Sequence, residues 1–137
     1  MKIKTSYQGQ KRFADGEGES RVVMDAAAAG GGRGEALNPK QMVLQGLAGC
    51  TGLDVVSILG KKGVEFEQFE LEVEAEQTQL HPVVFKKIVI TYRFKGDPAN
   101  RKHYERAVEL SETRFCGVSA MLKESAEIET VVEIEPT

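Results

Sequence analysis

The residues of this chain most able to do chemistry are its two cysteines. Cys50 lies in "GLAGCTGLDVVSIL" and Cys116 lies much later, in "RFCGVSAML". Such a pair can be two inert core thiols, two metal ligands, a structural disulfide or the reacting groups of a thiol enzyme. A metal site is disfavoured, because the two histidines, His81 and His103, do not stand at a spacing that metal sites use.

The predicted surroundings of the two cysteines favour redox chemistry. Cys116 is expected where one helix ends and another begins, and backbone N–H groups and the helix dipole stabilise a thiolate there. Cys50 is expected inside a long apolar helix, where burial disfavours the thiolate and a nearby cation would be needed. In a two-cysteine cycle one thiolate attacks a peroxide and becomes a sulfenic acid. The other thiol then closes a disulfide, and an external dithiol restores both.

Length and composition predict one domain over residues 1–137. Hydrophobic residues make up 41% and charged residues 28%, and the net charge of −3 disfavours a basic nucleic-acid groove. The N-terminal residues lack the apolar run of a signal peptide. The longest apolar region contains Asp54 and is expected to fall short of a membrane span. We therefore expect a cytoplasmic protein with no membrane and no nucleic-acid partner, whose cysteines are free or transiently oxidised.

A long helix is predicted around Cys50. Asn38 is a good N-cap and Pro39 suits the first helical position, so the helix is expected over 39–59 with Gly60 near its C-cap. Its apolar residues cover most of the circumference, which is typical of a central, buried helix. Three glycines at a spacing of three would let another helix approach, within the chain or across a dimer interface: Gly46, Gly49 and Gly52.

The remaining segments predict a sheet and two shorter helices. "FELEVEAE" alternates apolar residues with glutamates, and "VVFKKIVITYRFKGD" supplies a partner strand, so an antiparallel hairpin is expected with its basic residues facing the glutamates. "EIETVVEIEP" should add a further strand. "RVVMD" predicts a short strand, and "ADGEGES" before it a turn. Helices are expected over 98–115 and 118–126, the first burying Tyr104, Ala107, Val108, Ser111 and Phe115.

Two segments resemble the signature regions of the OsmC/Ohr family, the osmotically inducible and organic hydroperoxide resistance proteins. They are "NPKQMVLQGLAGCTGLDVVSIL" and "ETRFCGVSAMLKESAEI". The first resembles the family's Asn-Pro opening with a cysteine twelve residues after the Asn, and the second its Cys-x-x-Ser segment. The order of strands and helices is similar along nearly the whole chain, most of all to uncharacterised OsmC-like proteins.

The resemblance implies an α+β fold in which antiparallel sheets wrap two central helices of an intertwined homodimer, with active sites at the interface. It implies reduction of organic hydroperoxides, with Cys50 as the peroxidatic and Cys116 as the resolving cysteine, and a lipoyl-type dithiol as reductant. Because thiolate attack needs neither metal nor flavin, no cofactor and no metal are expected.

Several positions depart from the family pattern. Lys40 stands where family peroxidases carry a glutamate ten residues before the first cysteine. Arg12 is by spacing the nearest candidate for the activating arginine, with Arg21 and Arg33 as alternatives. Asp54 lies one helical turn after Cys50 and would oppose thiolate formation if it faced the thiol.

Three functions follow as hypotheses. The first is a thiol-dependent hydroperoxide reductase. The second is a non-catalytic dimer that binds a small apolar ligand, because the activating pair is altered. The third is an interaction protein that uses its exposed, glutamate-rich strands.

Overall fold

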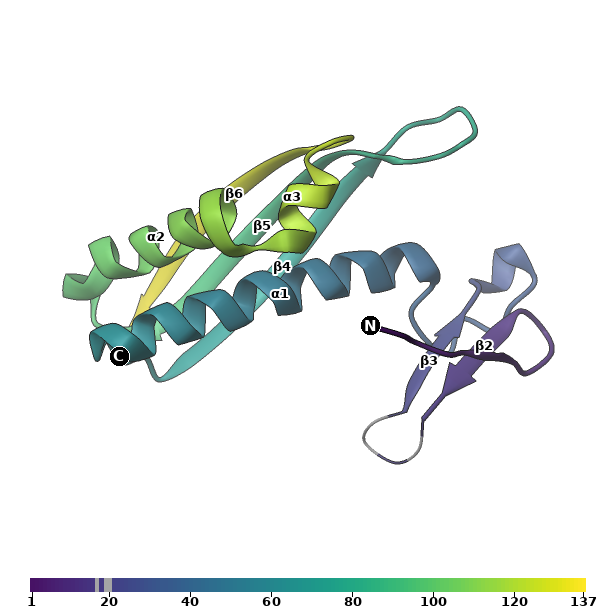
Figure 1. Ribbon diagram of the computed structural model, residues 1–137, viewed down its shortest axis with the longest axis horizontal. Coiled ribbons are helices and arrows are strands. Elements are labelled where there is room, and N and C mark those ends of the chain that lie inside the picture. The colour runs from purple at the N-terminus through teal and green to yellow at the C-terminus, as the bar shows by residue number, and fades with distance from the viewer. Residues whose placement is uncertain (17, 19–20) are drawn as a thin grey trace. The chain divides into compact units, whose positions relative to one another are not determined.

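The computed structural model describes residues 1–16, 18 and 21–137, so part of the predicted turn "ADGEGES" lies outside the described residues. The chain forms two compact units, Met1–Gln45 and Gly46–Thr137, and each is described here by itself (Figure 1). The single domain over 1–137 stays a prediction.

The first unit contains a small antiparallel sheet. Its strands are β1 (Ser6–Tyr7), β2 (Arg12–Asp15) and β3 (Val22–Asp25), in the order β1-β2-β3. The short strand predicted at "RVVMD" is thus confirmed. At the end of β3 the buried carboxylate of Asp25 accepts hydrogen bonds from the backbone N–H groups of Arg33 and Glu35, at 3.4 and 3.3 Å. Asp25 therefore organises the glycine-rich loop, which also contains a 3-10 turn at Ala28–Gly30.

Helix α1 (Pro39–Lys62) begins as predicted and ends later. The Asn38 side chain accepts from the backbone N–H of Gln41, and the Gln41 side chain accepts from the backbone N–H of Asn38, both at 2.9 Å. This reciprocal pair is a capping box, which satisfies two N–H groups at the helix start. The predicted stop at Gly60 was wrong, because the left-handed turn that ends the helix falls at Gly63, with φ +67°.

The second unit contains a three-stranded sheet in the order β4-β5-β6. Strands β4 (Gln68–Gln77) and β5 (Phe85–Gly96) form the expected antiparallel hairpin. Strand β6 (Glu127–Pro136) joins β5 in parallel, so this sheet is mixed where antiparallel pairing was expected throughout. A parallel pair needs a long crossover connection, and the helices between β5 and β6 provide it.

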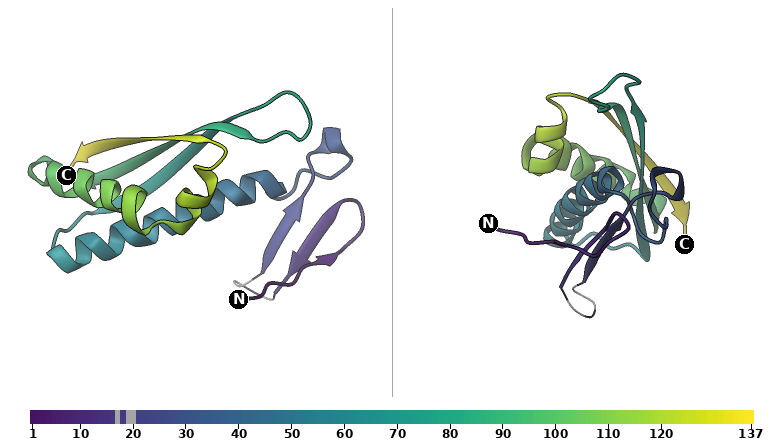
Figure 2. Two further views of the ribbon diagram at one scale, coloured as in Figure 1. Left: turned by 45° about the horizontal axis from the view of Figure 1, so that its top comes forward. Right: turned by 90° about the vertical axis from the view of Figure 1, so that its right-hand side faces the viewer.

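The crossover contains a 3-10 turn at Pro98–Asn100, helix α2 (Arg101–Leu110), a π turn at Ser111–Phe115 and helix α3 (Gly117–Leu122). Figure 2 shows the helices along one face of the sheet. The expected core is buried between them: Leu47, Val55, Leu59, Ile88, Ile90, Tyr92, Phe94, Tyr104, Ala107 and Val108. Phe115, expected in this core, is 56% exposed, because the π turn changes the helical register before it.

The other face of the sheet is charged. Arg93 on β5 forms ion pairs with Glu70 and Glu72 on β4 and with Glu133 on β6. Lys86 similarly meets Glu76 at 4.0 Å. The predicted cross-strand pairing with the glutamate row is therefore confirmed for Arg93 and Lys86, whereas Lys87 pairs with Glu129 on β6 and Lys95 with Glu67 before β4.

Helix α1 buries one face and leaves the other uncovered in the single chain, whereas the sequence predicted burial nearly all round. Leu53 is 72% exposed, and Val43 and Val56 are also exposed. A Cβ placed on Gly46 or Gly49 meets no heavy atom within 4 Å. By length and composition α1 could span a membrane, contrary to the expectation from Asp54. We call the uncovered residues the apolar face of α1: Val43, Gly46, Gly49, Leu53 and Val56.

The end of β5 generates a stability prediction. A Cβ on Gly96 would lie 2.4 Å from the Tyr104 hydroxyl, which donates to the Glu65 carbonyl at 2.9 Å. Gly96→Ala should displace this buried tyrosine and lower the free energy of unfolding by about 1–3 kcal/mol, measured by urea unfolding.

The matched control is Gly117→Ala, since a Cβ there meets no heavy atom within 4 Å. It should leave stability within about 0.5 kcal/mol of the original protein. Equal stability of the two variants would contradict the close packing of Tyr104 on Gly96.

Candidate thiol site

The fold brings the two cysteines together. Cys50 lies on α1 and is partly exposed, whereas Cys116 is 4% exposed and is the N-cap of α3. The Cys50 thiol is one of the groups that raise the pKa of the Cys116 thiol, so the two sulfurs are neighbours, and both cysteines are free. Two residues far apart in the sequence thus share one site, as a reacting pair requires.

Cys116 is positioned by the π turn and by α3. Its backbone N–H donates to the Ser111 carbonyl at 2.8 Å, which closes the wide turn. Its Sγ accepts a hydrogen bond from the backbone N–H of Ser119 at 3.3 Å. The predicted location between two helices is confirmed.

The predicted thiolate at Cys116 is not found. Burial raises the pKa of the Cys116 thiol to about 11, and the Ser119 N–H opposes this only in part. The neighbouring Cys50 thiol and the carboxylate of Glu112 raise this pKa further. Cys116 is therefore a protonated thiol at neutral pH, since desolvation outweighs the helix N-terminus.

A chain of buried hydroxyls lies beside the thiols. Thr51, which follows Cys50, is 2.7 Å from both the Tyr92 hydroxyl and the Ser111 hydroxyl. Ser111 donates to Asp54 Oδ2 at 2.9 Å. Because each hydroxyl has one proton, Thr51 must donate to Ser111 and Tyr92 to Thr51. Burial raises the pKa of Tyr92, so it stays protonated and can be the donor at the end of the chain.

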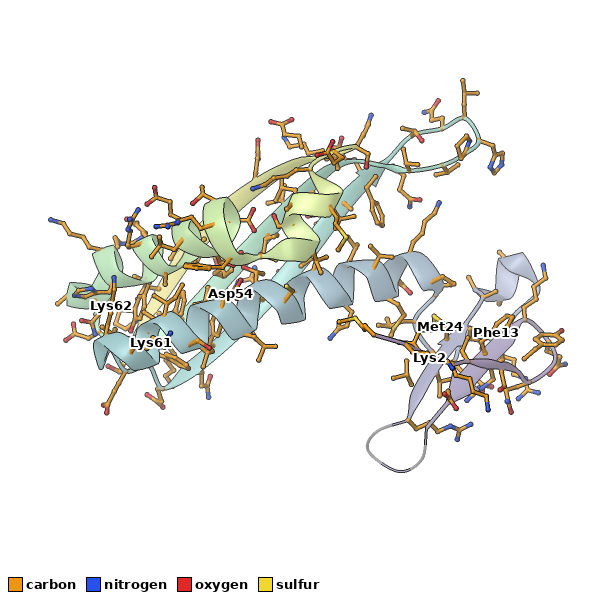
Figure 3. The ribbon with its side chains drawn as sticks, viewed as in Figure 1. Lys2, Phe13, Met24, Asp54, Lys61 and Lys62 are labelled. Carbon is orange, nitrogen blue, oxygen red and sulfur yellow. The ribbon has the colours of Figure 1, made fainter. Side chains whose placement is uncertain are left out.

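Asp54 is held by this chain. Asp54 lies on α1 (Figure 3), and its carboxylate accepts a hydrogen bond from the Ser111 hydroxyl. The groups that shift the pKa of Cys116 are Ser119, Cys50 and Glu112, besides burial. The repulsion expected from Asp54 concerned the Cys50 thiol and stays a prediction.

Glu112 is a site residue that the sequence interpretation missed. Its side chain is 9% exposed, and its Oε2 accepts from the Ser119 hydroxyl at 2.8 Å and lies 3.3 Å from Lys123 Nζ. Its Oε1 is buried and has no hydrogen-bond partner among the described residues. The Cys-x-x-Ser segment indicated Ser119, but no sequence pattern indicated the π turn or the glutamate within it.

The candidate arginines belong to the N-terminal unit. Arg12 Nη1 lies 2.9 Å from Glu35 Oε2, and Arg33 contacts the Gln10 side chain. Arg21 is exposed. Within 46–137, where every residue is described, no arginine forms an ion pair or hydrogen bond with either cysteine. Across the described part of the chain, no three His, Cys, Asp or Glu side chains gather as metal ligands would.

Comparison with known proteins places this site in a family. A model of the OsmC-like protein family matches residues 31–131, which include both cysteines. The chain is 31% identical over 114 residues to protein YhfA of Escherichia coli strain K12, covering 83% of this chain and 82% of YhfA.

Solved structures share the fold. A hypothetical protein from Aquifex aeolicus VF5 is 25% identical, with a TM-score of 0.82 over 100% of this chain and 99% of that chain. An organic hydroperoxide resistance protein OsmC from Legionella pneumophila is 18% identical, with a TM-score of 0.69 over 96% and 97% of the two chains. The family match covers residues 31–131 and both cysteines, and the chain therefore belongs to the OsmC-like family.

Proposed function

We propose that this protein reduces organic hydroperoxides through Cys50 and Cys116, in the cytoplasm, with a lipoyl-type dithiol as reductant. The observation that carries the proposal is the proximity of two free thiols, because the Cys50 thiol itself raises the pKa of the Cys116 thiol. Membership of a family that contains hydroperoxide resistance proteins supports the same reaction.

The cycle has balanced steps. The Cys50 thiolate attacks the distal peroxide oxygen, the O–O bond breaks, and the released alkoxide takes up a proton to become an alcohol. Cys50 is then a sulfenic acid. The Cys116 sulfur attacks the Cys50 sulfur, the hydroxyl leaves as water with the Cys116 proton, and a disulfide forms. The dithiol reduces this disulfide by exchange and is itself oxidised.

The roles of the two cysteines follow from their environments. Cys50 is the more exposed, so a substrate can reach it. Cys116 is buried, and its pKa of about 11 keeps it protonated until its partner has reacted. These differences support Cys50 as the peroxidatic and Cys116 as the resolving cysteine.

Activation of Cys50 needs a cation, and Arg12, the nearest candidate by sequence spacing, is the hypothesis that the arginine variants below test. Its guanidinium is already paired with a carboxylate, that of Glu35. Glu35 thus supplies an acidic partner in a chain that carries Lys40 where family peroxidases carry glutamate.

A homodimer completes the proposal. The apolar face of α1 is uncovered, and its glycines leave room for a second helix to approach closely. Exposed apolar stripes of this kind typically mark association surfaces. A second copy of the chain is the partner that we propose for it.

Binding of a small apolar ligand without turnover is the second candidate. It is favoured by a hollow of about 660 Å³ in the N-terminal unit, lined in part by Ile3, Val22, Met24 and Met42. This alternative predicts stoichiometric binding that survives Cys50→Ser, with no consumption of peroxide.

The peroxidase proposal is tested by stopped-flow oxidation with an alkyl hydroperoxide such as cumene hydroperoxide. Cys50→Ser should abolish turnover. Cys116→Ser should still form one sulfenic acid per chain, trapped by dimedone, but should form no disulfide within the chain. Oxidation of Cys50 no faster than that of free cysteine would refute the proposal.

Arginine variants serve as a matched pair in the same assay. Arg12→Ala should slow Cys50 oxidation at least about tenfold, because it removes the stabilising charge. Arg21→Ala removes an exposed arginine and should leave the rate unchanged. An equal effect of both variants would show that Arg12 does not activate Cys50.

The dimer is tested at Leu53. Leu53→Glu puts a charge in the middle of the apolar face of α1, where desolvating it in an interface is costly. The variant should elute as a monomer in size-exclusion chromatography with light scattering. Leu80→Glu, a change of the same kind at an exposed loop leucine, should remain dimeric. Identical masses of the two variants would rule out this face as the interface.

A further inference from the structure

The environment of Glu112 is not explained by the fold alone. Its carboxylate lies in the π turn, nine-tenths buried, four residues before Cys116. One oxygen is bound by Ser119 and Lys123, and the other is buried without a partner. An unpaired buried carboxylate oxygen costs free energy, and such groups cluster at functional sites.

Ser119 connects this carboxylate to the Cys116 thiol. Its backbone N–H donates to Cys116 Sγ at 3.3 Å, and its hydroxyl donates to Glu112 Oε2 at 2.8 Å. One residue thus holds the sulfur and the carboxylate in fixed positions. The short helix α3, which begins at Gly117, fixes Ser119 in turn.

We propose that Glu112 is a positioning residue that adds to burial in disfavouring the thiolate of Cys116 in the reduced protein, so that Cys50 reacts first. This order of reaction rests on the proposed function. Glu112 acts by its charge and does not touch the substrate: a negative charge beside Cys116 opposes a second negative charge on the sulfur.

The other ionisable neighbours do not take over this role. Cys50 on α1 contacts the Cys116 thiol and is the group that reacts. Tyr92 on β5 is neutral, and Asp54 on α1 is bound by Ser111. Lys123 is partly exposed and pairs with Glu112, so it weakens the charge of Glu112.

This arrangement makes opposite predictions for Glu112 and Lys123. In a Cys50→Ser background, Cys116 is the remaining thiol, and its alkylation by iodoacetamide can be followed from pH 7 to 10.5. Glu112→Gln should lower the pKa of Cys116 and speed alkylation at pH 8.5 at least about threefold. Lys123→Gln should slow it, because Glu112 then acts unopposed. Glu124→Gln, at an exposed position nearby, should change nothing.

The opposite signs separate a charge effect from a loss of structure. Loosening of the π turn would expose Cys116 and speed alkylation in both variants, and that result would overturn the proposal. An unchanged pH profile in Glu112→Gln would also overturn it. If Glu112→Gln does not fold, Lys123→Gln carries the test alone, and alkylation as fast as in the reference protein refutes the proposal.

A second measurement tests the order of reaction in the protein with both cysteines. After substoichiometric hydroperoxide and dimedone, mass spectrometry should find the label on Cys50, and Glu112→Gln should raise the share on Cys116. The same share in both proteins would refute the ordering role. The alkylation assay uses no peroxide, so failure of the peroxidase proposal leaves the charge effect of Glu112 independently measurable.

Discussion

The thiol site depends on the hydrogen bonds of the Thr51 hydroxyl. It joins α1 to Tyr92 on β5 and to Ser111 at the end of α2, each at 2.7 Å. Its neighbour in the chain is Cys50, and the Ser111 carbonyl holds the backbone of Cys116. One buried hydroxyl therefore connects the three elements that place the two sulfurs. Buried polar chains of this kind are stable only when every member is satisfied, which makes their geometry unusually specific.

The two carboxylates near the site differ in their hydrogen bonding. Asp54 ends the hydroxyl chain, where its Oδ2 accepts from Ser111, whereas Glu112 has one buried oxygen without a hydrogen-bond partner among the described residues. The two carboxylates therefore differ in what they can influence. Asp54 accepts a hydrogen bond from Ser111, and the Glu112 carboxylate adds to burial in raising the pKa of Cys116. The charged surroundings of the thiol site are therefore asymmetric in the substrate-free protein.

Much of this could be read from the sequence, because it depends on local patterns. The Asn38 cap, the alternating strands and the buried face of β5 follow from spacing and periodicity. The parallel pairing of β6 could not be read, because alternation does not reveal strand direction. The π turn was also hidden, and with it the exposure of Phe115 and the placement of Glu112. The protonated state of Cys116 depends on burial by distant segments, which outweighed the local effect of the helix start.

The parallel pairing of β5 with β6 also has a consequence for synthesis of the chain. Because β6 follows α2 and α3 in the chain, the sheet beneath these helices is complete only after both cysteines have been made. Pairings between distant segments form slowly, since a long loop must close first. Before β5, β6 and the helices between them have packed, the two thiols therefore have no fixed separation.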